Sequence, residues 1–244
     1  MKRKVSKQLC LLMAGSLILA GLSGCAGKKT GDYAANDPLE GFNRVVFKFN
    51  KGVDFVLLDP VTTIYKVLMP DLVQKAVHNF LDNLSSPVVA ANQVLQGDVN
   101  GAGKTLGRFA LNTTLGVGGL LDVMEKDKRS DEDFGQTLAS WGAGHGAYLV
   151  LPVIGSTSLR DMSGKIVDDL VDPFNITFRD HDWYAAYYSR MGLEAVSTRA
   201  RYIDEIKALQ KQSTDEYAAR RAVYFQRRDK QTGGKASDTA DIPE

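Results

Sequence analysis

The first 25 residues constrain this chain most, because they decide where the folded part begins and what surrounds it. An apolar run extends from Leu9 to Leu22. Four basic residues precede the run: Lys2, Arg3, Lys4 and Lys7. This layout is typical of a secretory signal peptide, and the run is shorter than the roughly 20 apolar residues that span a bilayer. We therefore predict that residues 1–24 are a signal peptide.

The signal peptide ends in Leu22-Ser23-Gly24-Cys25, which resembles a bacterial lipobox. In that motif the cysteine thiol receives a diacylglycerol and the new amino terminus is acylated, so the resemblance implies lipidation at Cys25. Several acyl chains would hold the protein on a bilayer, since each buried methylene contributes ~0.8 kcal/mol. Ala26 stands where an aspartate would retain a Gram-negative lipoprotein in the inner membrane, which implies the outer membrane, periplasmic side. The alternative is an ordinary signal peptide in which Cys25 is a chance thiol.

Charge and cysteine content narrow the classes of function. The chain carries 30 Lys and Arg and 29 Asp and Glu. Removal of residues 1–24 takes away four basic and no acidic side chains, leaving 26 against 29 and a net charge of −3. No basic excess remains to indicate nucleic acid as a partner. The only cysteines are Cys10 and Cys25, so we expect no disulfide in the exported protein.

The rest of the chain divides into a tether, a helical domain and a tail. Residues 25–36 are small and polar and predict a flexible tether behind the anchor. Residues 37–228 carry apolar side chains at helical spacing and predict an all-α domain with one short extended segment near Tyr148 to Leu151. Residues 229–244 are polar and predict a disordered tail.

Prolines divide the helical domain into short amphipathic helices. Asp37, Pro38 and Glu40 predict the first helix start, with Asp37 as cap and Glu40 completing a capping box. Ser213 and Glu216 predict a second capping box before the last helix. Further breaks are expected at Asp59-Pro60, Met69-Pro70, Ser86-Pro87 and Asp172-Pro173.

No motif indicates catalysis, a metal or a cofactor. Asn100 to Thr105 resembles a phosphate-binding loop. However, Asp98 stands where that motif requires a glycine, and no strand is expected before the loop. His78, His145 and His181 lack ligand-spaced neighbours, which argues against a metal site. Ser156 lacks the glycines of a nucleophile elbow. The acidic pairs Asp131 with Asp133 and Asp168 with Asp169 favour caps or solvated faces over acid–base chemistry.

Aromatic residues form two stripes whose role the sequence leaves open. One stripe includes Phe42, Phe49 and Phe55, and the other runs from Trp183 to Tyr188. Such stripes ordinarily form a core, but in a tethered protein they can also lie in a membrane leaflet. The arginine-rich helix after Ser213 likewise allows a solvated face, contact with lipid headgroups, or docking to a partner.

An ordered set of motifs across nearly the whole chain resembles the MlaA family, also called VacJ. The set opens with Asp37-Pro38-Leu39-Glu40-Gly41-Phe42-Asn43-Arg44 and Asp59-Pro60. It continues with Asn79-Phe80-Leu81-Asp82-Asn83-Leu84, Leu95-Gln96-Gly97-Asp98, Leu115-Gly116-Val117-Gly118-Gly119, Asp133-Phe134-Gly135-Gln136-Thr137-Leu138, Leu159-Arg160-Asp161, Thr198-Arg199-Ala200 and Tyr224-Phe225-Gln226-Arg227.

The resemblance implies an all-α ring of short amphipathic helices lying in the membrane plane, embedded in the inner leaflet of the outer membrane. It implies a non-enzymatic outer-membrane lipoprotein without cofactors that removes mislocalised phospholipid from the outer leaflet through an amphipathic channel. The implied partners are phospholipid, the outer-membrane bilayer, trimeric porins and a soluble periplasmic phospholipid carrier.

Seven residues are candidates for shaping or gating the channel. We expect flexible corners at Gly116, Gly118 and Gly119 and at Gly144 and Gly146. Phe42 and Asn43 are a second candidate position, where the alternative is that Phe42 packs and Asn43 forms hydrogen bonds without gating. Two other functions stay open: a porin-associated structural envelope lipoprotein without transport activity, and a lipid hydrolase, for which no nucleophile site is evident.

Overall fold

The computed structural model describes residues 37–124 and 129–233. The predicted signal peptide, Cys25 and the predicted tether therefore lie outside the described residues, as do residues 234–244 of the predicted tail. The elements are α2 (Glu40–Val53), η1 (Asp54–Leu58), α3 (Asp59–Leu68), α4 (Asp71–Leu95), α5 (Val99–Thr114), α6 (Phe134–Ser140), β1 (Tyr148–Leu151), β2 (Gly155–Ser158), α7 (Leu159–Val171), α8 (Pro173–Asp180), α9 (Tyr184–Gln212) and α10 (Glu216–Gln231).

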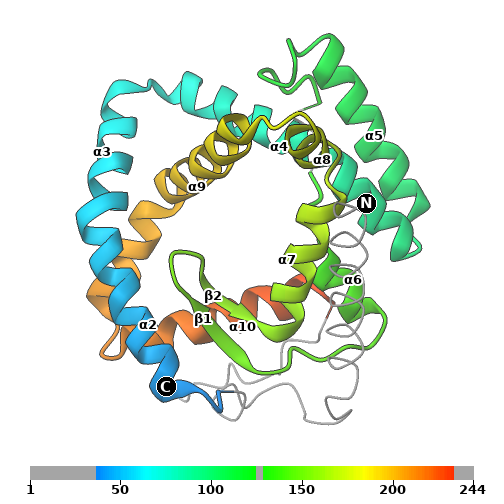
Figure 1. Ribbon diagram of the computed structural model, residues 1–244. Helices are drawn as coiled ribbons and strands as arrows, with labels where there is room; N and C mark the ends of the chain where they lie inside the picture. Colours follow the sequence, from blue (N-terminus) through cyan, green and yellow to red (C-terminus); the bar gives the residue numbers. More distant parts are fainter. Residues whose placement is uncertain (1–36, 125–128, 234–244) are drawn as a thin grey trace, which may run out of the picture.

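The helices follow one another around a ring (Figure 1). α2, η1 and α3 form one side, α4 the next, α7 and α8 the third, and α10 closes the ring beside α2. α5 packs against α4 on the outside of the ring, and α9 runs back from α8 to pack against α3. The expected helical fold is confirmed. In place of a single extended segment, Tyr148 to Leu151 pair antiparallel with Gly155 to Ser158.

Two predicted proline breaks are absent from the structure. Pro87 lies inside α4, which continues for 25 residues. Packing of buried Leu81, Val89 and Ala90 along this helix outweighs the ~3 kcal/mol that an interior proline costs. At Asp59-Pro60 the chain passes through the π-helical turn η1 directly into α3. Pro60 lies in the first turn of α3, where the N–H that a proline lacks is not required.

Both predicted capping boxes are wrong. Asp37 is buried, and its carboxylate accepts hydrogen bonds from Asn43 Nδ2 at 2.8 Å, from Arg221 Nη1 at 2.6 Å and from the Tyr217 hydroxyl. α2 consequently has no side-chain cap. α10 is capped by Asp215, whose Oδ1 accepts from the amide of Ala218 at 3.2 Å, rather than by Ser213.

The last helix also extends beyond the boundary expected at residue 228. α10 ends at Gln231. Asp229, predicted to begin the disordered tail, is buried, and its Oδ1 lies 2.7 Å from Nε2 of His145. A charged residue that looks solvated in the sequence is thus part of the contact between α10 and the segment before β1.

A small apolar core lies where α2, the hairpin and α10 meet. The Phe47 ring packs edge-on against Tyr217, with centroids 5.6 Å apart. The cluster consists of Val46, Phe47, Tyr148, Val150, Tyr217 and Phe225. Elsewhere polar contacts join the ring: on α9, Arg199 donates to Asp59 at 2.9 Å and lies 3.4 Å from Asp54 of η1. The ring is therefore held by one local core and by hydrogen-bonded charges around its circumference.

Candidate functional site

At the candidate position formed by Phe42 and Asn43, one side chain is exposed and the other is buried in the wall of the ring. Asn43 is fully buried, and its amide nitrogen donates to the carbonyl oxygen of Tyr148 at 3.0 Å. The side-chain oxygen of Asn43, Oδ1, accepts from the backbone amide of Val150 at 2.9 Å. Phe42 is 60% exposed, so the part of the alternative in which Phe42 packs is wrong, whereas the part in which Asn43 forms hydrogen bonds is confirmed.

Asn50 repeats this arrangement two helical turns later. Its side-chain nitrogen donates to the carbonyl oxygen of Leu151 at 2.9 Å, and its oxygen accepts from the amide of Val153 at 2.8 Å. Residues seven apart lie on the same face of a helix, so Asn43 and Asn50 together satisfy one edge of β1. α2 takes the place of a third strand, which closes an otherwise unpaired sheet edge. The spacing of these asparagines was the signal that sequence reasoning missed.

The candidate corner Gly116 to Gly119 is a tight backbone turn after α5. A Cβ atom on Gly116 would lie 2.2 Å from the carbonyl oxygen of Leu121. Gly119, with φ at +97°, lies so close to Asn83 of α4 that a Cβ would meet that side chain at 2.6 Å. The amide of Gly119 donates to the carbonyl oxygen of Asn112 at 2.8 Å. Gly116 is therefore required by close approach within the turn, and Gly119 by close approach of the turn to α4.

Gly118 differs from the two glycines beside it. Its φ is +71°, but no atom lies within 4 Å of the place where its Cβ would be. Val117 also has a positive φ, of 55°, which a β-branched residue rarely adopts. The backbone of the turn is therefore strained at Val117, whereas Gly118 has free space where a side chain would be.

The candidate corner Gly144 to Gly146 is anchored to α10 through His145, its middle residue. His145 is hydrogen-bonded to Asp229, and its ring packs edge-on against Phe225 with centroids 5.1 Å apart. Burial, with the nearby Arg160 charge, lowers the pKa of His145 despite that hydrogen bond. Gly144 has open space around it, whereas a Cβ on Gly146 would lie 3.2 Å from Leu159. The hairpin brings this segment near Asn43, while the Gly116 turn lies apart, beside α4.

A buried charge cluster joins α10 to the starts of α6 and α7. Arg228 donates from Nη1 to Asp133 Oδ2 at 2.6 Å and from Nη2 to Asp161 Oδ1 at 2.9 Å. Burial would raise the pKa of both carboxyl groups, but the Arg228 guanidinium, helped at Asp161 by Arg160, outweighs burial and holds each pKa below its usual range. The sequence favoured a cap or a solvated face for Asp133. Asp133 does cap α6, by accepting from the amide of Gln136 at 2.9 Å, but the sequence did not indicate its ion-pair partner, Arg228, which lies 95 residues away.

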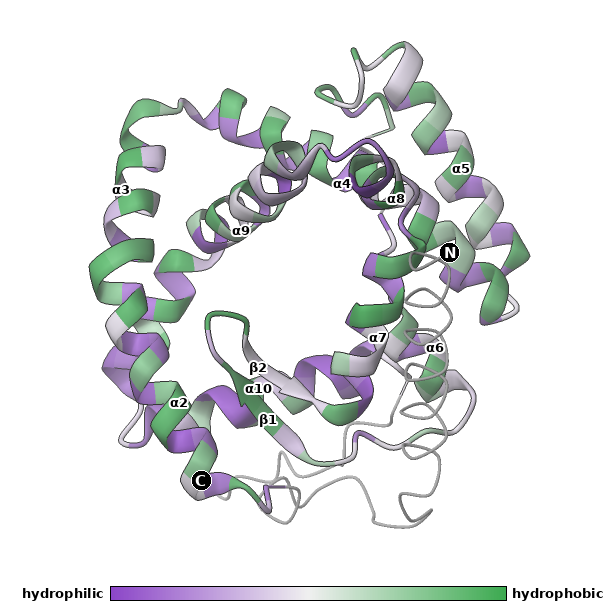
Figure 2. Ribbon diagram, viewed as in Figure 1, coloured by the Kyte–Doolittle hydropathy of each residue, from purple (hydrophilic) through white to green (hydrophobic). Residues whose placement is uncertain are grey.

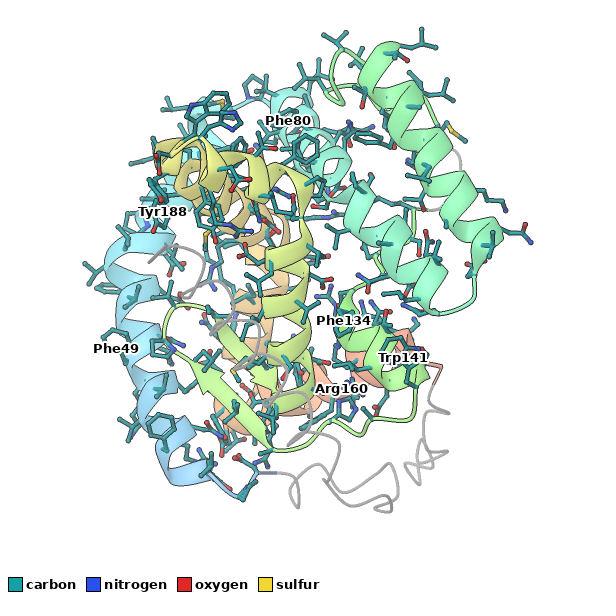
Figure 3. The ribbon with its side chains drawn as sticks, turned by 45° about the vertical axis from the view of Figure 1, so that its right-hand side comes forward. Phe49, Phe80, Phe134, Trp141, Arg160 and Tyr188 are labelled. Carbon is teal, nitrogen blue, oxygen red and sulfur yellow. The ribbon has the colours of Figure 1, made fainter. Side chains whose placement is uncertain are left out.

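Large apolar side chains are exposed along the outer elements of the ring. Phe55 and Val67 are each 77% exposed, and Leu72 is 73% exposed. Figure 2 shows apolar residues on α2, α3 and the start of α4, and Figure 3 labels Phe49 on α2 and Tyr188 on α9, both exposed. Further exposed members are Val45, Val56, Leu57, Ile64, Leu68, Trp183, Tyr184 and Met191. Most residues of the two aromatic stripes are therefore exposed rather than buried in a core.

Two further properties concern only the described part of the chain. There, no helix is long and apolar enough to cross a membrane. Also within residues 37–124 and 129–233, no group of three or more histidine, cysteine or acidic residues is arranged to hold a metal ion.

The MlaA lipoprotein family model matches residues 35–231. The chain belongs to the MlaA lipoprotein family. It is 36% identical over 228 residues to the intermembrane phospholipid transport system lipoprotein MlaA of Escherichia coli K12, covering 91% of this chain and 87% of that protein. It is 30% identical to the protein of the same description from Haemophilus influenzae, covering 88% and 87% of the two chains.

A solved structure described as the structural basis for maintenance of bacterial outer membrane lipid asymmetry is similar in fold as well. It superposes with a TM-score of 0.70 at 36% identity, covering 80% of this chain and 98% of the other. The resemblance predicted from the motifs is thus confirmed. MlaA lipoproteins form a transport family and not an enzyme family, which disfavours the lipid hydrolase alternative.

Proposed function

We propose that this protein is the outer-membrane lipoprotein of an intermembrane phospholipid transport system and helps to maintain lipid asymmetry. The observation that carries the proposal is the exposed apolar surface of a ring whose own elements are joined by buried hydrogen-bonded charges. Relatives described as intermembrane phospholipid transport lipoproteins support it. A ring of this kind can rest in one leaflet without any spanning helix.

The proposed route for lipid is through the ring. A phospholipid headgroup needs polar partners along its path, because burying an unpaired charge costs several kcal/mol. Acyl chains need an apolar surface beside that path. The helices of the ring are amphipathic, with Asn43, Arg199 and Arg228 hydrogen-bonded within the wall and Phe55 and Val67 exposed on its surface. The proposed direction is from the outer leaflet to the periplasm.

The proposed location is the periplasmic face of the outer membrane, with acyl chains on Cys25 and the ring embedded in the inner leaflet. The exposed apolar residues of α2, η1 and α3 supply the surface that such embedding needs. Trimeric porins and a soluble periplasmic phospholipid carrier are the proposed partners, by resemblance to the family.

Seven residues are proposed to shape or gate the route: Phe42, Asn43, Gly116, Gly118, Gly119, Gly144 and Gly146. Among these, Gly144 offers the cleanest test, since open space surrounds it and a larger side chain changes backbone freedom without a clash. Gly146 is less suitable, because a side chain there is strained at φ +67° and approaches Leu159.

Transfer of labelled phospholipid from proteoliposomes to purified carrier tests the proposal. The wild-type protein should transfer lipid, and Gly144→Val should change the transfer rate while thermal stability and porin binding stay at wild-type values. A wild-type protein that binds porin but transfers no lipid above protein-free vesicles would favour the alternative of a porin-associated structural lipoprotein. Lipidation is tested separately by mass spectrometry, in which the Cys25→Ser protein should lack the additional mass of the acyl chains that the wild-type protein carries.

A further inference from the structure

A half-buried histidine lies where α4 and α9 pack against each other (Figure 1). His78 is on α4, and its Nε2 atom is within hydrogen-bonding distance of Nη1 of Arg201 on α9. The same Nε2 atom lies 3.2 Å from Oδ2 of Asp82, one turn further along α4. A further charge, that of Lys75, lies one turn before His78 on the same helix. One nitrogen of His78 therefore has a partner on each of the two helices.

The two partners of this nitrogen require different protonation states of His78. A guanidinium only donates hydrogen bonds, so Arg201 needs a lone pair on Nε2. An ionised carboxylate only accepts them, so Asp82 needs a proton on Nε2. The neutral imidazole that carries its proton on Nδ1 accepts from Arg201. The imidazolium instead donates to Asp82 and repels the guanidinium, so the two contacts exclude each other.

The charges around His78 favour its neutral form. Arg129, in the segment before α6, forms an ion pair with Asp82 and lies 3.4 Å from Asp131. The negative charge of Asp82 is therefore already engaged. Burial, together with the positive charges of Arg201 and Arg129, lowers the pKa of His78 below its ordinary value. The opposing effect of Asp131 is smaller. At neutral pH the imidazole is therefore uncharged and able to accept from Arg201.

The ion pairs that join α9 to η1 and α3 are of a different kind. Arg199 donates to Asp59 at 2.9 Å and lies 3.4 Å from Asp54. Lys66 of α3 lies 3.7 Å from Asp204 of α9. None of these ion pairs contains a histidine, the side chain that ordinarily changes its charge between pH 5 and 8. Mild acid therefore acts on the contact of α9 with α4 and leaves its ion pairs with η1 and α3 in place.

We propose that protonation of His78 loosens α9 from α4 while α9 stays attached to α3, which makes this part of the ring sensitive to mild acid. The imidazolium gives up a hydrogen bond between two helices for one to Asp82 on its own helix. Loosening relieves the repulsion from Arg201, so the loosened state binds the proton more readily than the closed state. The contact is therefore intact above about pH 6.5, where a free histidine is neutral, and weakens as pH falls below it.

Hydrogen exchange of the full-length protein in detergent at pH 7.5 and pH 5.5, corrected for intrinsic exchange rates, tests the proposal. Amides of α9 around Arg201 should exchange at least about threefold faster at pH 5.5, which corresponds to a pKa lowered by half a unit, while amides of α3 keep their corrected rates. His78→Gln retains an acceptor for Arg201 but cannot be protonated, so this variant should lose the difference. His181→Gln, at an exposed histidine after α8, is the matched control and should keep it.

A second measurement follows the imidazole of His78 itself, and it needs only the wild-type chain and Arg201→Gln. The chain has three histidines, so NMR of carbon-13-labelled histidine resolves each titration. The midpoint of His78 should lie below about pH 6.5 and should rise in Arg201→Gln, because the repelling guanidinium is gone. A midpoint that this substitution leaves unchanged would overturn the contact. Exchange near Arg201 that is equal at the two pH values, or equally pH-dependent in His78→Gln, would overturn the loosening of α9.

Discussion

The side-chain amide of Asn43 replaces a neighbouring strand for Val150, because its oxygen accepts the Val150 N–H at 2.9 Å while its nitrogen donates to the carbonyl oxygen of Tyr148. The same nitrogen also donates to Asp37, whose carboxylate accepts a hydrogen bond from Arg221 of α10. One asparagine therefore connects the first helix, the hairpin and the last helix. These are the elements that meet where the ring closes.

Replacement of Asn43 by alanine should lower the free energy of unfolding by about 3 kcal/mol, because buried backbone groups of Tyr148 and Val150 lose their partners. Urea denaturation followed by circular dichroism measures the change. Lys48→Ala, on the exposed side of the same helix, should stay within about 0.5 kcal/mol of wild type. If Asn43→Ala altered lipid transfer without altering stability, the anchoring role would be wrong and a state-setting role favoured.

Local chemistry made several helix boundaries predictable from the sequence. Asp133 accepts from the amide of Gln136, Ser158 from that of Asp161, and Asp172 from that of Phe174. In each case donor and acceptor lie within three residues, so the pattern contains the whole interaction. The break expected at Asp172-Pro173 is confirmed, since α7 ends at Val171 and α8 begins at Pro173.

Long-range partners explain the predictions that were wrong. Asp37 has the sequence context of a cap, yet its partner Arg221 lies 184 residues away. The sequence before Pro87 resembles a helix end, but packing along α4 decides otherwise. The ring depends on such tertiary contacts, so periodicity alone predicted the helices without placing them.

Gly116→Ala should destabilise the turn after α5 by about 1–3 kcal/mol, because its Cβ would approach the carbonyl oxygen of Leu121 to 2.2 Å and force the backbone to move. Thermal unfolding measures the effect. Gly107→Ala is the matched control, since it lies in the helix with no atom near its Cβ position, and it should stabilise by about 0.5–1 kcal/mol. Equal effects at both positions would contradict close approach as the reason for Gly116.

Phe55→Glu with Val67→Glu should weaken binding to phospholipid vesicles, because both apolar side chains are 77% exposed. Each substitution removes about 1.5–3 kcal/mol of apolar transfer free energy, or at least roughly tenfold in partitioning. Vesicle flotation in a Cys25→Ser background measures this without acyl chains. Glu205→Gln, which changes an exposed polar residue of α9, is the control and should float as the parent does. If the double variant also floated as the parent does, Phe55 and Val67 would not contact lipid.

Acid should unfold the protein through the carboxylates that Arg228 holds. The pKa of Asp133 and that of Asp161 are both lowered, because the guanidinium outweighs the effect of burial. A carboxyl group with a depressed pKa in the folded state stabilises the fold above its unfolded pKa, about 3.9, and loses that contribution as pH falls through the folded value. Urea midpoints should therefore be steady above about pH 5 and fall below about pH 4.

Arg228→Met should reverse this dependence at the cluster. Without the guanidinium, burial raises the pKa of Asp133, while Asp161 keeps Arg160 as its ion-pair partner, so the variant is weakened by about 3–5 kcal/mol at pH 7, where both carboxylates are charged. Protonation removes the uncompensated charge, and the stability difference from wild type should shrink as pH falls from 7 toward 4. Arg227→Met, at the exposed neighbouring position, should track wild type across this range. A deficit of Arg228→Met that is constant with pH would show that lost packing, rather than lost charge pairing, causes the weakening.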